Sequence, residues 1–103
     1  MTDRELLELA AKAVGKDIDS DRYDEEWGFA IRHMAKFWNP LLDDGDALRL
    51  AVSLNIDTLH RSEVWATLAG KGLQLSETYN EDPNSATRRA IVRAAAEIGR
   101  AMK

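Results

Sequence analysis

The sequence predicts an α/β fold, a small sandwich in which about three helices pack on a short antiparallel sheet. Three observations predict it. Amphipathic helical patterns with recognisable ends occur near both ends of the chain and in its middle. Between them, apolar and polar residues alternate as in half-buried strands. The 103 residues, 45% hydrophobic and 31% charged, suit one globular domain, 1–103.

The first helix is predicted over residues 3–14. Thr2 and Glu5 match a capping box, in which each side chain binds the backbone N–H of the other residue. Gly15 can adopt the left-handed conformation that ends a helix. The apolar stripe consists of Leu6, Leu9, Ala10 and Ala13, widened by Leu7 and Val14.

The next two segments are less regular. Residues 16–26 are polar and acidic, and we expect a connecting loop there. In the following segment Trp27, Phe29 and Ile31 alternate as in a strand, although the spacing from Ile31 to Trp38 also suits a helix. We favour an extended segment followed by a loop.

The stretch WNPLLDDGD, residues 38–46, predicts a turn and then the start of a central helix. Pro40 disfavours a helical conformation for the residue before it. Asp43 or Asp44 suits the N-cap, and the other aspartates fall in the first turn, where the helix dipole favours negative charge. We expect a helix from about 44 to 54 with an apolar face of Leu48, Ala51 and Val52, beside Leu50 and Leu54.

Residues 55–79 predict strands. Gly70 and Gly72 supply a permissive hairpin turn. The residues NIDTLH before this hairpin suit a further strand. A helix over 62–69, capped by Ser62 and stopped by Gly70, is the alternative. The expected strand faces are Val64, Ala66 and Leu68 before the turn, and Leu73, Leu75 and Tyr79 after it.

The chain closes with an alanine-rich amphipathic helix. Asn84 or Ser85 is the expected N-cap, after a turn set by Pro83. An alanine-rich helix can approach a sheet closely because its side chains are small. The apolar stripe, centred on Ile91, comprises Thr87, Ala94, Ala95, Ile98 and Met102. The opposite side carries Arg89, Arg93, Glu97 and Arg100.

Two segments, Trp38–Asp57 (WNPLLDDGDALRLAVSLNID) and Asp82–Met102 (DPNSATRRAIVRAAAEIGRAM), resemble the phage ABA sandwich domain. The N-terminal LLELAAKAVG also fits this family of small bacteriophage and prophage proteins. The NinX-like phage proteins are similar more distantly, through an NP followed by DA. The resemblance implies an α-β-α sandwich and a phage origin, and it implies no known reaction or catalytic residue. Family members carry Thr where this chain has Leu42, so Asp43 must serve as the helix cap.

Composition excludes several classes of function. Without cysteine the chain has no disulfide, thiolate catalyst or cysteine-ligated metal. The net charge of −4 disfavours nucleic-acid binding. Charges interrupt the apolar part of the N-terminus, unlike a signal peptide, and no apolar run reaches the roughly 20 residues of a membrane span. We expect the cytoplasm of a bacterial host cell as the location.

Metal and cofactor chemistry have weak support. Asp43, Asp44 and Asp46 are the weak metal candidates, since hard cations favour clustered carboxylates. Their spacing is not that of an EF-hand, and helix capping explains at least two of them. His33 and His60 match no ligand spacing. We therefore predict no metal, no cofactor and no catalytic residue, and we disfavour an enzyme.

Protein binding is the favoured class of function, and three groups of residues are candidates. Tryptophans are expected mainly in or beside the core, but an exposed one would make a good interface anchor. An acidic stretch could mimic a polyanion. The arginines on the last helix are interrupted by Glu97, which we expect to pair with Arg93 at i, i+4, and this pattern predicts a solvated face. The candidates are Trp27, Trp38, Trp65, Asp24, Glu25, Glu26, Arg89, Arg93 and Arg100.

The first hypothesis is a non-enzymatic accessory protein of phage or prophage origin that binds a protein partner, for example a bacterial host protein or a component of a defence system such as CRISPR. The alternative is a self-associating structural module, a homo-oligomer with no host target. A metal-dependent enzyme built on the aspartates and histidines comes last.

Overall fold

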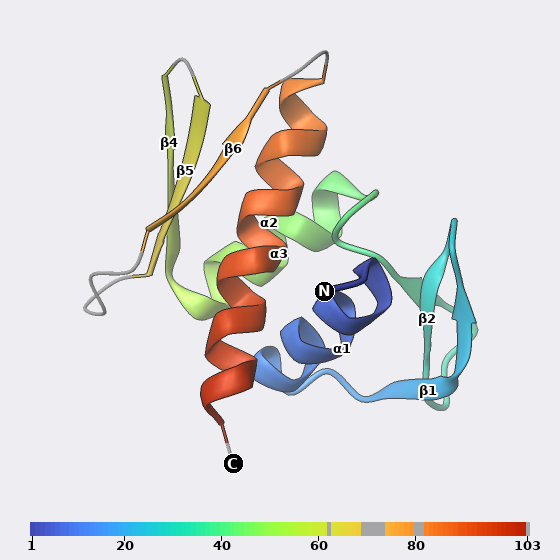
Figure 1. Cartoon of the computed structure of the whole chain (residues 1–103). Coiled ribbons are helices and arrows are strands. Elements are labelled where there is room, and N and C mark those ends of the chain that lie inside the picture. The colour runs from blue at the N-terminus through green and yellow to red at the C-terminus, as the bar shows by residue number, and fades with distance from the viewer. Residues whose placement is uncertain (62, 69–73, 80–81, 103) are drawn as a thin grey trace.

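The computed structural model describes residues 1–61, 63–68, 74–79 and 82–102. Within these ranges it contains three helices and two antiparallel sheets of three strands each (Figure 1). The elements are α1 (Asp3–Val14), β1 (Ile18–Asp24), β2 (Gly28–Ile31), β3 (Phe37–Trp38), α2 (Asp44–Leu54), β4 (Ile56–His60), β5 (Glu63–Leu68), β6 (Gln74–Thr78) and α3 (Pro83–Ala101).

The predicted fold class and the three helices are confirmed. The strands differ from the prediction because they form two sheets rather than one: sheet A has the order β1-β2-β3, and sheet B has the order β4-β5-β6. Figure 1 shows α3 between sheet B and α1, with β1 and β2 beyond α1. The helices therefore occupy the middle of the molecule.

The central helix α3 is buried on more sides than its predicted stripe. Alanines make this possible, because small side chains allow α1, α2 and sheet B to approach closely. A Cβ added to Gly99 would lie 2.0 Å from the carbonyl oxygen of Leu9, so α1 and α3 are in backbone contact. Met102, predicted on the stripe, is exposed beyond the helix end. The buried residues are Ala86, Ala90, Ile91, Val92, Ala94, Ala95, Ala96 and Gly99.

The helix ends follow local chemistry. The predicted capping box of α1 is present, and its hydrogen bonds from the backbone and hydroxyl of Thr2 lower the pKa of Glu5. Gly15 ends α1 with φ 72°. The predicted N-cap of α3 is wrong, because Asp82 occupies this position. Its carboxylate accepts hydrogen bonds from the backbone N–H groups of Asn84 and Ser85, the two residues that we expected as caps. Proline then occupies the first helical position, which it favours.

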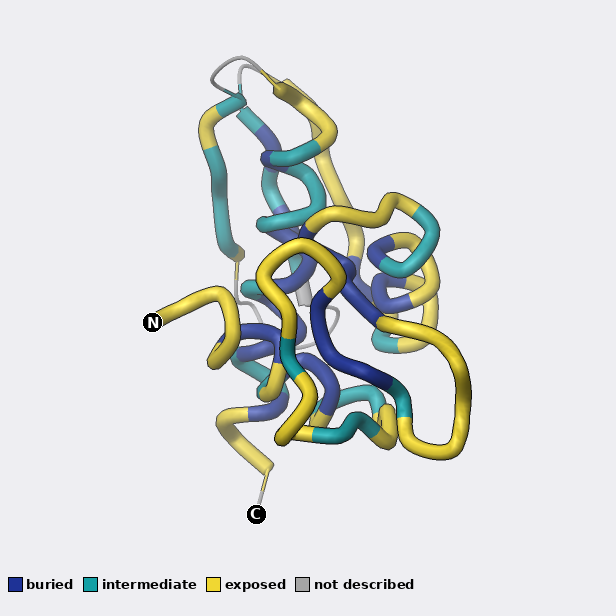
Figure 2. Tube along the Cα trace, turned by 90° about the vertical axis from the view of Figure 1, so that its right-hand side faces the viewer, coloured by how far each residue is buried: buried dark blue, intermediate teal, exposed yellow. Residues whose placement is uncertain are grey.

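The predicted loop at 16–26 is wrong, because residues 18–24 form β1. Only Ile18, Asp19 and Tyr23 of this strand are even partly buried, so its sequence lacks the apolar face that marks a strand. Its pairing with β2 is interrupted by a bulge between Asp19 and Tyr23. The extended reading of the next segment is confirmed for β2, which Figure 2 shows buried while the segment after it is exposed.

Sheet B confirms the predicted strands and excludes the alternative helix over 62–69. The pairing of β4 with β5 is continuous from Ile56–Leu68 to His60–Val64. Val64 and Ala66 are fully buried against the core. Successive side chains of a strand point to opposite faces, so Trp65 lies on the face turned away from α3. The predicted turn at 70–72, with Ser62 and Leu73, lies outside the described residues.

Candidate binding surface

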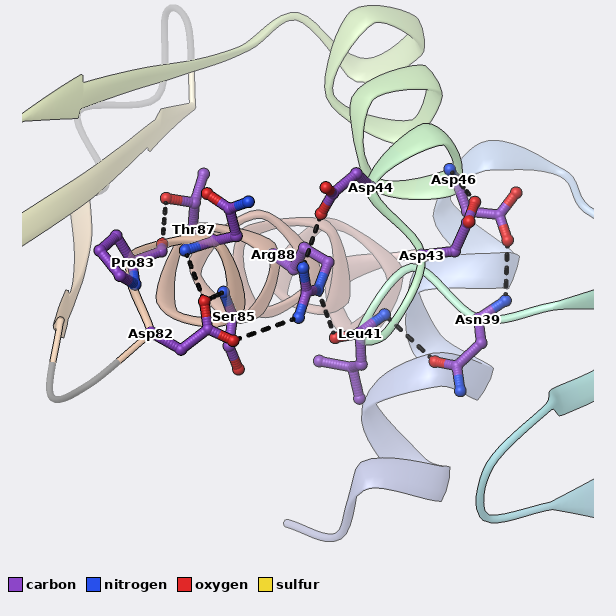
Figure 3. A network of polar contacts seen from close by, with 11 residues as sticks. Asn39, Leu41, Asp43, Asp44, Asp46, Asp82, Pro83, Ser85, Thr87 and Arg88 are labelled. Atoms are coloured by element: carbon purple, nitrogen blue, oxygen red, sulfur yellow. Dashed lines mark hydrogen bonds and ion pairs between the residues drawn. The ribbon is translucent and has the colours of Figure 1, made fainter.

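The three clustered aspartates organise the start of α2 (Figure 3). Asp43 is the N-cap and accepts the backbone N–H of Asp46 at 2.8 Å. Asp46 in turn accepts the backbone N–H of Asn39 at 3.0 Å. The buried Asn39 accepts the N–H of Leu41 through its side chain. The stretch that contains Asn39 and Pro40 is therefore a tightly bonded turn and helix start, as the sequence predicts.

Arg88 ties this turn to α3. Its side chain is only 13% exposed, and its Nε donates to the carbonyl oxygen of Leu41 at 2.8 Å. One terminal nitrogen lies 2.6 Å from Asp44, and the other lies 4.0 Å from Asp82, the N-cap of α3 (Figure 3). The planar guanidinium suits three acceptors at once. The arginine therefore joins the starts of two helices.

Replacing Arg88 with methionine is expected to lower the free energy of unfolding by about 2 kcal/mol, because the carbonyl of Leu41 loses its side-chain donor. The methionine keeps most of the apolar stem. Urea unfolding followed by circular dichroism measures the change. The matched control is Arg22→Met, at an exposed arginine for which the described residues supply no ion pair. An equal effect of both substitutions would show that Arg88 has no special structural role.

The metal candidates have other roles. Each of the three aspartates is engaged by backbone N–H groups or arginines. In the described ranges, no group of three metal-ligating side chains is assembled. His33 lies in a turn with φ 62°, and Nδ1 of His60 lies 3.3 Å from the hydroxyl of Tyr79. No group of three ligands therefore unites these histidines with the aspartates in the described part of the chain.

The arginines of α3 are paired within the chain. Arg89 lies 2.9 Å from Asp3, and Arg100 lies 3.2 Å from Glu97. The sequence predicts a pair between Arg93 and Glu97, and this is wrong. Arg93 instead forms an ion pair with Glu77 of β6 and donates to the carbonyl oxygen of Ser76. Arg93 pairs with Glu77 and not with Glu97 because α3 packs directly on sheet B. Arg89 and Arg93 therefore hold the helix to its neighbours, whereas Arg100 pairs within α3.

The three tryptophans have different environments. Trp38 is buried in the core, and Trp65 is half-buried on sheet B. Trp27 is 63% exposed, and its ring centroid lies 6.3 Å from that of Phe37, which is 40% exposed. Phe37 was not among the sequence candidates. The sequence did indicate that Phe37 is exposed: neighbouring side chains of a strand face opposite sides, and Trp38 was expected in or beside the core.

The turn that carries Trp27 is held from both sides. Oδ1 of Asp24 accepts the backbone N–H of Glu26 at 2.8 Å and that of Trp27 at 3.0 Å. The side-chain amide of Asn39 donates to the carbonyl oxygen of Glu26 at 3.3 Å. Gly28 has φ 84°, and a Cβ there would lie 2.2 Å from the carbonyl oxygen of Trp38. This turn is therefore rigid.

The acidic side chains of this turn have different roles. Asp24 positions the backbone, whereas Glu25 and Glu26 are exposed and form no ion pair within the described part of the chain. The acids adjoin Trp27 in the chain, and Phe37 lies beside its ring, so we call these residues the aromatic–acidic patch, comprising Asp24, Glu25, Glu26, Trp27 and Phe37. It combines two apolar rings with two free carboxylates.

Tyr23 connects the patch to the core. Its ring lies 4.8 Å from that of Phe29, and the guanidinium of Arg4 lies 5.4 Å above it. Burial raises the pKa of Tyr23, and the nearby carboxylates of Asp3 and Glu25 act in the same direction. The phenol therefore stays neutral and serves packing.

A second apolar feature lies between α2 and β4. Leu48 and Val52, predicted to face the core, are 64% and 68% exposed and line a groove of about 610 Å³. The prediction is wrong for these two residues because α3 packs on the neighbouring side of α2, burying Ala47, Leu50 and Ala51. The opposite wall of the groove includes Thr58 and His60 of β4.

Comparison with known proteins gives no significant match to a family model, a curated protein or a solved structure. The resemblance to the phage ABA sandwich domain therefore stays a prediction from the sequence. Among the described residues, no helix has the length and apolar character needed to cross a membrane.

Proposed function

We propose that this chain acts by binding a protein partner and that the aromatic–acidic patch is the contact surface. The observation that carries the proposal is Trp27, a large aromatic side chain held 63% exposed beside Phe37. Tryptophan is enriched among the residues that dominate binding free energies. The unpaired carboxylates of Glu25 and Glu26 lie next to it in the chain. A fitting partner offers an apolar pocket with a basic rim.

The rigidity of the turn supports the same proposal. A contact residue that is already ordered loses little conformational entropy on binding. Asp24 and Asn39 hold the backbone on either side of Trp27 through hydrogen bonds. The free carboxylates supply electrostatic complementarity, which favours fast association and selects basic partners.

The resemblance stated above suggests the biological setting. We propose that the chain is a small phage or prophage accessory protein that binds a host protein in the bacterial cytoplasm. Proteins that bind nucleic acid carry basic surfaces, so a component of a defence system such as CRISPR is a fitting partner class for an acidic patch.

Substitution of the patch is expected to abolish capture of the partner. Tagged wild-type protein and the variants Trp27→Ala and E25K/E26K are incubated with bacterial lysate, and retained proteins are quantified by mass spectrometry. A single hot spot of about 2 kcal/mol corresponds to about thirtyfold in affinity. Each variant should therefore lose most of the specifically retained protein.

The charge-matched control is E63K/E97K, which changes the net charge equally on other elements. Glu63 begins β5, and Glu97 has only a surface ion pair with Arg100, which contributes little. Met102→Ala controls for the loss of an exposed apolar side chain, because Met102 is 43% exposed beyond the end of α3. If these controls lose the partner as fully as the patch variants, or if the patch variants retain it, the patch is not the contact surface.

A further inference from the structure

The outer edge of sheet B at β4 differs from the other long edge strands. The edge strand β1 has the carbonyl of Ser20 bound by Arg4 at 2.8 Å, and the edge strand β6 has the carbonyl of Ser76 bound by Arg93 at 3.0 Å. No side chain of the described residues binds the backbone of β4. Its register with β5 is continuous, without a bulge. Such an edge is a template for a further strand.

The open groups of β4 can be identified from its register. Arg61, just after the strand, donates its backbone N–H to Glu63. Backbone groups alternate in direction along an antiparallel strand, so those of Leu59 also point to β5. The N–H and C=O groups of Thr58 and His60 then point to the open edge. A new strand must bond to these two residues.

The charged side chains along this edge of one copy are complementary to those of a second copy. Asp57 and Arg61 are exposed, and neither has an ion-pair partner in the described part of the chain. If β4 pairs antiparallel with a second β4 about Leu59, Thr58 lies opposite His60 of the second copy, which satisfies the open groups. The same register places Asp57 opposite Arg61 of the second copy, and by symmetry this ion pair forms twice.

Apolar residues follow the same symmetry. Leu59 is 50% exposed and lies opposite Trp65 on the face turned away from α3. Pairing about Leu59 brings the leucines of both copies together, so an apolar row of two leucines and two tryptophans crosses the new sheet. On the other face, Leu48 and Val52 line the groove beside β4 and become covered by the added strand.

From these observations we propose that β4 binds a second copy of this chain and forms a continuous six-stranded antiparallel sheet. The contact is isologous and closes as a dimer. It stops there because arginines bind the backbone of the other two long edge strands, at Ser20 of β1 and Ser76 of β6. The inference does not rest on the proposed function, because the aromatic–acidic patch lies on sheet A.

Charge reversal tests this register. The full chain is examined by sedimentation velocity over a dilution series that reaches millimolar protein. Wild-type protein should change from monomer to dimer. The single variants D57R and R61D each place like charges opposite one another twice, which should raise the dissociation constant about tenfold. An equimolar mixture of both variants restores opposite charges and should dimerise as the wild type does.

The control is D21R, which makes the same change of charge at an exposed aspartate of β1 without an ion-pair partner in the described residues. Its dissociation constant should equal that of the wild type. The proposal is overturned if wild-type protein stays monomeric throughout the series, if D57R and D21R behave alike, or if the mixture fails to restore the dimer. Retention of the partner by D57R, measured in the same lysate experiment, separates this result from the role of the patch.

Discussion

Replacing Gly99 with alanine is expected to lower the free energy of unfolding by about 3 kcal/mol, the upper range for overpacking a core. The new methyl group would lie 2.0 Å from the carbonyl oxygen of Leu9 and 2.8 Å from its carbon, both backbone atoms that cannot rotate away. The helices α1 and α3 must therefore separate. This sign is unusual, because alanine in a helix is ordinarily more favourable than glycine by about 1 kcal/mol.

The matched control is Gly45→Ala in the first turn of α2. The nearest atoms to its new Cβ are guanidinium nitrogens of Arg49 at 3.2 Å and a carboxylate oxygen of Asp43 at 3.3 Å. The flexible arginine can move, so the free energy of unfolding should stay within about 0.5 kcal/mol of wild type. Urea denaturation of both variants measures their free energies of unfolding. Equal stability of the two variants would contradict the close contact between α1 and α3.

Replacing Phe29 with alanine is expected to lower the free energy of unfolding by about 3–5 kcal/mol. Phe29 is fully buried in β2 and packs against Tyr23, with the guanidinium of Arg4 5.8 Å from its ring. A domain of this size has only about 5–15 kcal/mol in total. Thermal unfolding should therefore begin far below that of the wild type, and sheet A should lose protection from hydrogen exchange first.

Phe37→Ala is the control for this prediction, because it removes the same side chain from the neighbouring strand. Phe37 is 40% exposed, so its loss should cost less than about 1 kcal/mol of stability. It should nevertheless weaken capture of the partner, since it supports Trp27 in the aromatic–acidic patch. A destabilisation by F37A as large as that by F29A would show that Phe37 belongs to the core and not to a binding surface.

The candidate site was partly predictable. Asp24, Glu25, Glu26 and Trp27 adjoin one another in the sequence, and composition alone indicates an acidic surface with an aromatic anchor. Phe37 is ten residues away and joins them only because β2 lies beside both β1 and β3 in sheet A. Its contact with Trp27 depends on that pairing, which no local pattern records.

The sequence by itself determined the three helices, their starts to within about three residues, and a cap at Asp43 or Asp44, because capping and helical periodicity depend on neighbours within one or two turns. It also determined the strands of sheet B through their alternation. Only the tertiary structure decided that the strands form two sheets, that Leu48 and Val52 face solvent, and that Arg93 pairs with Glu77. The physical reason is that burial and ion pairing depend on which distant segment packs beside a residue.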